Sequence, residues 1–146
     1  MSKDGTNGQR VFPMVAYEDV AAAIDWLTSA FGFREIGRMS GEDGRIGHAE
    51  LELNEGVIYL ASPTSDYQGP RRHQESCEQA RKWSAVPWII DGVMVEVADV
   101  DSHYRQAKDA GARILSGLED EPFGRIYRVE DVEGHRWMFV QPVATG

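Results

Sequence analysis

One helix-forming pattern occurs twice in the sequence, and the two copies start 80 residues apart. In the first copy Asp19 precedes apolar residues at helical spacing, and Gly32 follows them. In the second copy Asp99 and Gly111 hold the equivalent places. An aspartate caps the free N–H groups at the start of a helix, and a glycine supports a left-handed residue at its end. The pattern predicts two equivalent helices, the second over residues 100–110, in a chain built as an internal repeat.

Runs of β type flank both helices. The runs that precede them are VFPMVAY (11–17) and VMVEVA (93–98). Three further runs follow each helix, and a turn sequence separates the last two, NEG in the first half and DVEG in the second. Each half is therefore predicted to be a βαβββ module.

The two modules are expected to cover residues 11–62 and 92–143 and to fold as one domain of the α+β class. Within the first module, the run 46–53 alternates strictly between apolar and polar residues, as a strand with one buried face does. In the second module, EDEPFG (119–124) is expected to be an acidic loop before the seventh strand.

Two segments lie outside the modules. Residues 1–10 are polar and glycine-rich, and they lack the apolar region of a secretory signal, so we expect them to be disordered. Residues 63–91 form a linker between the modules. A short helix is predicted near 71–83, because Pro70 can begin it and Pro87 lies just beyond its end.

Composition and charge restrict the partners. The chain has 146 residues, of which 42% are hydrophobic, and this fits one soluble globular domain. A net charge of −9 argues against binding to nucleic acid or to an anionic membrane surface, but it is compatible with a cationic small molecule. No apolar run is long enough for a transmembrane helix. Since Cys77 is the only cysteine, no intrachain disulfide is expected and a reducing, cytoplasmic location is the default.

Three segments together resemble the vicinal oxygen chelate superfamily, which includes glyoxalase I, bleomycin-resistance proteins, fosfomycin-resistance enzymes and extradiol dioxygenases. They are YEDVAAAIDWLTSAFGF (17–33), VADVDSHYRQAKDAGA (97–112) and YRVEDVEGHRWMFVQP (127–142). The resemblance implies two βαβββ modules whose curved sheets face each other around a cleft. It also implies a homodimer, because members of this superfamily commonly dimerise.

The resemblance further implies where a metal would bind. Metal-dependent members place a ligand on the first and last strand of each module, and the matching positions here are Phe12, Tyr59, Val93 and Met138. Phenylalanine and valine have no donor atom, methionine sulfur is soft, and tyrosine is an uncommon ligand of divalent ions. The sequence therefore predicts neither a metal at these positions nor a cofactor.

The polar residues of the expected cleft come from the run 46–53, whose alternation leaves His48, Glu50 and Glu52 on the cleft face. The repeat pairs Glu50 with Arg128, either as a neutralising ion pair on a solvated face or as a polar anchor for a ligand. The full set of predicted ligand-binding residues is Phe12, Met14, His48, Glu50, Tyr59, Val93, Val95, Arg128, Arg136 and Met138.

The leading hypothesis is a metal-independent protein of the bleomycin-resistance type that binds an organic ligand, aromatic or cationic, in the cleft. The alternative is a glyoxalase-type lyase or isomerase with a displaced metal site at His48 and Glu50. A third possibility is a structural or regulatory dimerisation module. Trp83 and Trp88 flank the linker helix, where they are interpreted as packing residues, a ligand lid or a dimer contact, and His103 is expected at the surface.

Overall fold

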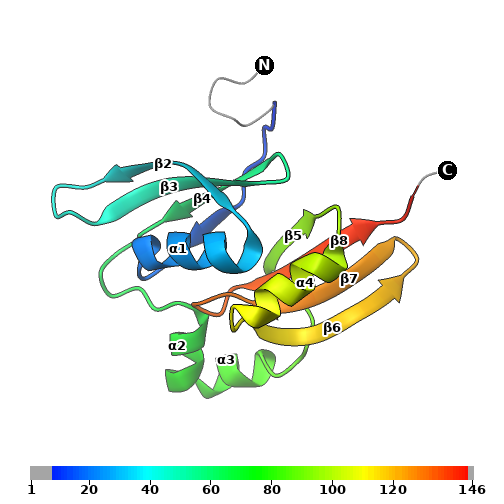
Figure 1. Cartoon of the computed structure of the whole chain (residues 1–146). Helices are drawn as coiled ribbons and strands as arrows, with labels where there is room; N and C mark the ends of the chain where they lie inside the picture. Colours follow the sequence, from blue (N-terminus) through cyan, green and yellow to red (C-terminus); the bar gives the residue numbers. More distant parts are fainter. Residues whose placement is uncertain (1–7, 145–146) are drawn as a thin grey trace. The chain divides into compact units, whose positions relative to one another are not determined.

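The computed structural model describes residues 8–144 and divides the chain into two compact units. Unit 1 is Met1–Gly69 and unit 2 is Pro70–Gly146. Each unit contains one four-stranded sheet with a helix packed on one of its faces (Figure 1). No helix in the described part of the chain is long and apolar enough to cross a membrane.

Unit 1 has the predicted βαβββ order. Its sheet, called sheet 1, has the strand order β1-β4-β3-β2, with β1 parallel to β4 and the other neighbours antiparallel. The elements are β1 (Met14–Ala16), α1 (Val20–Phe31), β2 (Arg34–Ser40), β3 (Ile46–Leu53) and β4 (Gly56–Ala61).

The first strand is shorter than the run 11–17 predicts. Pro13 has no N–H and cannot donate to a strand ladder, so it contributes only its carbonyl, which accepts a hydrogen bond from Tyr59 N–H at 2.9 Å. Of the segment expected to be disordered, residues 1–7 lie outside the described residues. Gln9, in contrast, is bound: its amide exchanges two hydrogen bonds with the backbone of Val57, at 2.7 and 2.8 Å.

The two caps of α1 confirm the sequence pattern. Asp19 Oδ1 accepts a hydrogen bond from Ala22 N–H at 3.0 Å, and Gly32 ends the helix with φ of 84°. The apolar side of the helix, which includes Ile24 and Leu27, is buried. Burial of this side against sheet 1 stabilises the unit by about 25 cal/mol for each Å² of apolar surface removed from water.

Unit 2 repeats the topology of unit 1. Its sheet, called sheet 2, has the order β5-β8-β7-β6, and Asp99 Oδ1 caps α4 by accepting from Ser102 N–H at 3.1 Å. The elements are α2 (Pro70–Ser76), α3 (Glu78–Trp83), β5 (Gly92–Glu96), α4 (Val100–Asp109), β6 (Arg113–Glu121), β7 (Gly124–Glu130) and β8 (Arg136–Pro142).

The linker and the acidic segment differ from their predictions. Instead of one helix near 71–83 there are two, because the backbone of Cys77 is extended and begins α3 as its N-cap residue. The acidic residues 119–121 are not a loop but the end of β6. They are accommodated in the strand because arginines of β7 pair with them: Arg125 Nη1 lies 3.0 Å from Asp120 Oδ1, and Arg128 Nη1 lies 2.6 Å from Glu119 Oε1.

Asp131 organises the turn between β7 and β8. Its buried carboxylate accepts hydrogen bonds from the N–H groups of Glu133 and His135 with one oxygen, and from Trp137 Nε1 with the other, each at 3.0 Å. Gly134 closes the same turn with φ of 95°. The aspartate and the glycine of the DVEG sequence therefore have separate roles, one as acceptor and the other as the left-handed residue.

His103 is buried, which corrects the expectation that it lies at the surface. It stands three residues after Val100 and four before Ala107, on the side of α4 that packs on sheet 2. Its Nδ1 lies 2.6 Å from the hydroxyl of Tyr127, and its ring centroid lies 4.0 Å from that of Phe139. The polar edge of the imidazole is thus satisfied within the core.

Burial raises the pKa of Tyr127, and this predicts an alkaline limit to stability. A tyrosine in the unfolded chain ionises at about pH 10, whereas the buried phenol of the folded protein stays protonated at that pH. Because the folded state then holds more protons, its stability is complete below about pH 10 and falls as the pH rises further. Ultraviolet absorbance should show a phenol fraction that ionises only on unfolding, and Tyr127→Phe should reduce that fraction by one tyrosine. An unchanged fraction in the variant would contradict the assignment.

Candidate functional site

Each sheet has one face against its helix and a second face, here called the far face. In sheet 1 the buried residues Ala49 and Leu51 lie on the helix side. Met14 and Glu50 are both register partners of Tyr59, so these three side chains share the far face. The alternation predicted for the run 46–53 is therefore the one observed, with His48 and Glu50 turned away from α1.

An aromatic stack occupies the far face of sheet 1. The rings of Phe12 and Tyr59 lie nearly parallel, with centroids 4.8 Å apart and an interplanar angle of 7°. His48 meets the edge of Tyr59 at 5.0 Å and 66°. Phe12 and Tyr59 remain partly exposed, and Met14 beside them is 74% exposed. The face thus offers flat apolar surface that the unit itself does not bury.

A histidine and a carboxylate border this stack. His48 Nε2 lies 3.2 Å from Glu50 Oε2. The side chain of His48 is 35% exposed and that of Glu50 is 27% exposed. The pair can accept or donate a hydrogen bond to a molecule placed on the aromatic rings. Across residues 8–144 no group of three or more His, Cys, Asp or Glu is arranged to hold a metal ion.

The far face of sheet 2 has a different character. Met138 is flanked by Met94 on β5 and Arg128 on β7, which are its register partners. Arg128 Nη1 donates to Ser116 Oγ at 3.0 Å and pairs with Glu119. This face therefore combines flexible thioethers with a guanidinium that already has a carboxylate partner, where sheet 1 has aromatic rings.

Val93 and Val95 do not belong to the far face, on which they were expected to line a cleft. Their partners in the parallel ladder are Trp137 and Phe139, two fully buried residues on the helix side. Side chains alternate along a strand, so an error of one residue exchanges the faces. Met94, which was not among the predicted site residues, takes the far-face position beside Met138, and the run 93–98 alone does not show which of its two faces is buried.

Arg136 is a structural residue and not an exposed polar end of a site. It is 6% exposed, and its guanidinium donates to the backbone carbonyls of Val86 and Trp88, each at 2.7 Å, and to that of Ser84. The remaining partner is Glu130, whose Oε2 lies 3.3 Å away. The guanidinium is thus engaged within unit 2, and Arg136 also lines the pocket beside α2 and α3, so its predicted contact with a ligand stays a prediction.

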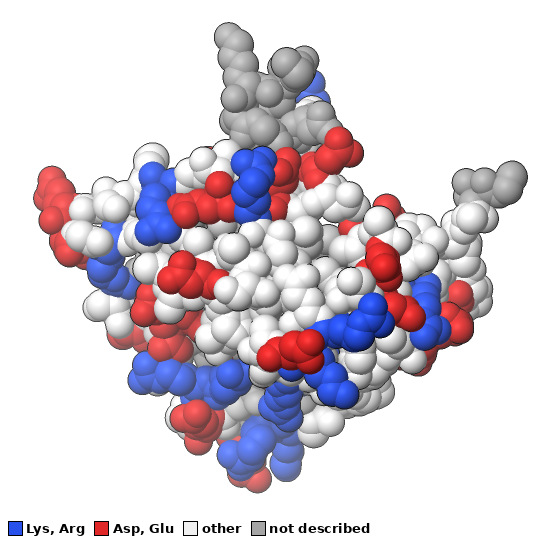
Figure 2. Space-filling view, viewed as in Figure 1, with Lys and Arg blue, Asp and Glu red and all other residues white. Residues whose placement is uncertain are grey.

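Glu50 and Arg128, which the repeat sets at equivalent positions, each have a partner inside their own unit. Glu50 contacts His48, and Arg128 contacts Glu119. Elsewhere on the surface opposite charges also alternate, as Figure 2 shows for the visible face and as the pair Arg34–Glu52 illustrates. Glu50 and Arg128 are therefore each paired locally.

The linker contributes a pocket that the sequence reasoning did not predict. It has a volume of about 340 Å³ and lies in unit 2 between α2, α3 and the turn before β8. Trp83 forms part of its wall and is 63% exposed, while Trp88 lies outside it and is 54% exposed. Two linker tryptophans thus retain accessible rings, and one of them borders a small pocket.

A structural role for Arg136 predicts a large loss of stability in Arg136→Met. The substitution leaves Glu130 buried with a weakened set of partners, which costs about 3–5 kcal/mol for a buried ion pair. Arg128→Met, at the neighbouring cross-strand position, should cost less than about 1 kcal/mol, because its side chain is 23% exposed and its partner Glu119 is 43% exposed. Urea unfolding monitored by circular dichroism would measure both. Equal losses in the two variants would contradict the role assigned to Arg136.

Comparisons with known proteins place these observations in a family. The family model described as Glyoxalase/Bleomycin resistance protein/Dioxygenase superfamily matches residues 11–139. A protein of Mycobacterium bovis, Mb0911c, is 33% identical over 136 residues, which are 90% of this chain and 82% of that protein.

Solved structures agree with the family model. TioX from Micromonospora sp. ML1 is 30% identical, with a TM-score of 0.66 and coverage of 94% of this chain and 99% of TioX. TnmS3, an antibiotic binding protein from Streptomyces sp. CB03234, is 16% identical, with a TM-score of 0.61 and coverage of 93% and 98%. At 16% identity the second likeness concerns the fold.

Proposed function

The chain belongs to the Glyoxalase/Bleomycin resistance protein/Dioxygenase superfamily, and from this premise we propose that it binds a small, flat organic molecule without using a metal ion. The observation that carries the proposal is the stacked pair of Phe12 and Tyr59 on the far face of sheet 1. Aromatic rings in this arrangement present a π-face to a further ring, which adds about 0.5–1.5 kcal/mol beyond simple burial.

The donor set supports binding without a metal. The resemblance assigns metal ligands to the positions of Phe12, Tyr59, Val93 and Met138. Phe12 and Tyr59 stack on each other, and Val93 lies on the helix side of sheet 2. A hard divalent ion prefers carboxylate or imidazole ligands, so these four residues do not fit the family's metal.

The bordering polar groups set the charge of the ligand. Glu50 supplies a carboxylate beside the rings, and the net charge of the chain is −9. A neutral or cationic aromatic molecule is therefore favoured over an anionic one, because the carboxylate attracts a cation and the ring face does the same. The likeness in fold to TnmS3, an antibiotic binding protein, supports an organic ligand of this size class.

A second candidate function follows from the contact of His48 with Glu50. An imidazole nitrogen 3.2 Å from a carboxylate oxygen is a pair that can transfer a proton or contribute two ligands to a metal site outside the family's usual positions. Such a protein would be a lyase or isomerase of the glyoxalase type. The two candidates differ in whether metal uptake accompanies activity.

Stacking predicts how Tyr59 variants respond to ligands. In a thermal-shift screen of flat aromatic cations, neutral aromatics and aromatic acids, cations and neutral compounds should stabilise the protein. A ligand at one hundred times its Kd adds about 2.7 kcal/mol. Tyr59→Phe keeps the ring and should retain the shift, whereas Tyr59→Ala should lose it. The proposal fails if no cationic or neutral compound stabilises the protein, or if Tyr59→Ala responds like the wild type.

Metal uptake separates the two candidate functions. Protein incubated with Zn²⁺, Ni²⁺, Mn²⁺ or Fe²⁺ and then dialysed should retain substoichiometric metal by elemental analysis, because the four family positions lack suitable donors. His48→Ala and Glu50→Ala should leave that result unchanged. Stoichiometric metal that disappears in both variants, together with turnover of a glyoxalase substrate, would establish the second candidate instead.

A further inference from the structure

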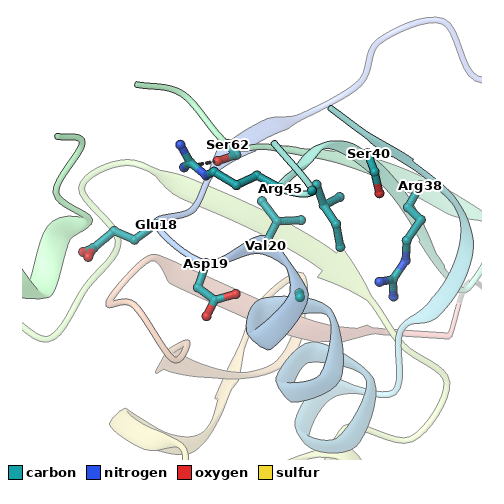
Figure 3. A pocket seen from close by; sticks show the side chains of 10 residues that line it. Glu18, Asp19, Val20, Arg38, Ser40, Arg45 and Ser62 are labelled. Atoms are coloured by element: carbon teal, nitrogen blue, oxygen red, sulfur yellow. Dashed lines mark hydrogen bonds between the residues drawn. The ribbon is translucent and has the colours of Figure 1, made fainter. Parts of the chain in front are cut away.

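A second pocket lies on the other side of sheet 1. It has a volume of about 540 Å³ and is bordered by the first turn of α1, the β2–β3 hairpin and the residue after β4. Arg38 is the register partner of Ala49, and Ser40 that of Ile46, which places this wall on the helix side and away from Tyr59. The polar residues that line the pocket are Glu18, Asp19, Arg38, Ser40, Arg45 and Ser62 (Figure 3).

The hairpin holds Arg45 in place. Asp43 Oδ1 accepts a hydrogen bond from Arg45 N–H at 3.0 Å, and Arg45 carbonyl accepts one from Gly41 N–H at 2.7 Å. Gly44, between them, has φ of 79°, a conformation that favours glycine. The backbone of Arg45 is therefore fixed before any ligand arrives.

The guanidinium of Arg45 lacks a counter-ion. Its Nη2 donates to Ser62 Oγ at 2.5 Å, and among the described residues no carboxylate lies within ion-pair distance of it. Arg38, in the same wall, differs because two of its three donor nitrogens, Nε and Nη2, donate to Glu35 at 2.5 and 2.9 Å, and this hydrogen bonding lowers the pKa of Glu35. Of the two arginines that line the pocket, Arg45 is thus the one without a carboxylate in direct contact with its guanidinium.

Ser62 completes an anion-binding pair with Arg45. Its oxygen accepts from Arg45, so its own proton can be donated elsewhere. A guanidinium and a hydroxyl side by side match the two oxygens of a carboxylate, and charge-assisted hydrogen bonds of this kind are about twice as strong as neutral ones.

Two residues with the opposite charge also line the pocket. Glu18 Oε2 accepts from Gly69 N–H at 2.8 Å, and Asp19 Oδ1 caps α1, so backbone bonds hold both carboxylates in position. In Figure 3 the pair Arg45–Ser62 lies above these two carboxylates. A doubly charged anion would be repelled by them, whereas a ligand with one anionic and one cationic group meets a complementary charge on each side.

From this arrangement we propose that the pocket binds a zwitterion of the amino-acid type. Its carboxylate contacts Arg45 and Ser62, and its ammonium group faces Glu18 and Asp19. A volume of about 540 Å³ accommodates a molecule of that size. The site is separate from the stacked rings of Phe12 and Tyr59, so it does not depend on the ligand proposed for them.

Three matched probes test the charge requirement on the full chain. L-Leucine carries both charged groups, 4-methylpentanoate lacks the amine, and 3-methylbutylamine lacks the carboxylate. Amide NMR spectra should show saturable shifts at residues 18–21, 40–46 and 62 with leucine, and each of the other probes should bind at least about tenfold more weakly, because each loses a charged partner. Absence of a saturable shift with leucine, or equal binding of 4-methylpentanoate, overturns the proposal.

Variants identify the residues responsible. Arg45→Gln and Ser62→Ala should each weaken leucine binding, the first by at least about tenfold because a charge-assisted bond is lost. Arg34→Gln is the matched control, since Arg34 also lies on the β2–β3 hairpin but pairs with Glu52 outside the pocket. Tyr59→Ala should bind leucine normally, which separates this site from the aromatic one. Wild-type affinity in both Arg45→Gln and Ser62→Ala overturns the assignment.

Discussion

The buried carboxylate of Glu130 is the interaction on which the architecture of unit 2 depends. It is 1% exposed, and three guanidinium groups surround it, at 3.3 Å from Arg71, 3.5 Å from Arg113 and 3.3 Å from Arg136. These arginines come from α2, β6 and β8, so one charge joins the linker to two strands of the sheet. Because an isolated buried carboxylate is costly to desolvate, the three elements are held together as a set.

The same region shows how closely the linker packs on the sheet. Arg71 also donates to the backbone carbonyls of Asp131 and Val132, each at 2.9 Å. A Cβ added to Gly134 would lie 2.8 Å from the backbone nitrogen of Arg71. Together with its φ of 95°, this contact leaves room only for glycine. The turn sequence DVEG is therefore determined both by its own backbone and by the helix that covers it.

The two units share a topology and differ in what their far faces carry. Asp19 and Asp99 cap equivalent helices, and the strand orders correspond one to one. Sheet 1 presents stacked rings with a histidine and a carboxylate, whereas sheet 2 presents methionines and a paired arginine. The repeated part of the sequence thus specifies the fold, and the residues that do not repeat distinguish one surface from the other.

Features set by local spacing could be predicted from the sequence. The caps of α1, the modules and the orientation of His48 and Glu50 follow from patterns within a few residues. Features set by packing between elements could not. Which of Val93 and Met94 faces the helix depends on the register of β5 with β8, and the run 93–98 alone does not determine that register.

Buried polar residues posed a similar difficulty. His103 was expected at the surface and Arg136 among the ligand-binding residues, yet both are buried, and their partners, Tyr127 and the linker carbonyls, come from distant segments. For His103 the spacing from Val100 and Ala107 was an available signal. For Arg136 no comparable pattern exists, because its acceptors are backbone atoms that any sequence provides.

The contacts of Arg136 have a consequence for how this chain can vary. The guanidinium recognises the carbonyls of Ser84, Val86 and Trp88, and a carbonyl is the same in every residue. The path of residues 84–88 is therefore specified by a single arginine on β8 and does not depend on which side chains those residues carry, whereas Arg71 in α2 acts through its own side chain. Substitutions at these three positions should therefore leave the fold intact, as long as the three carbonyls keep their places around the guanidinium.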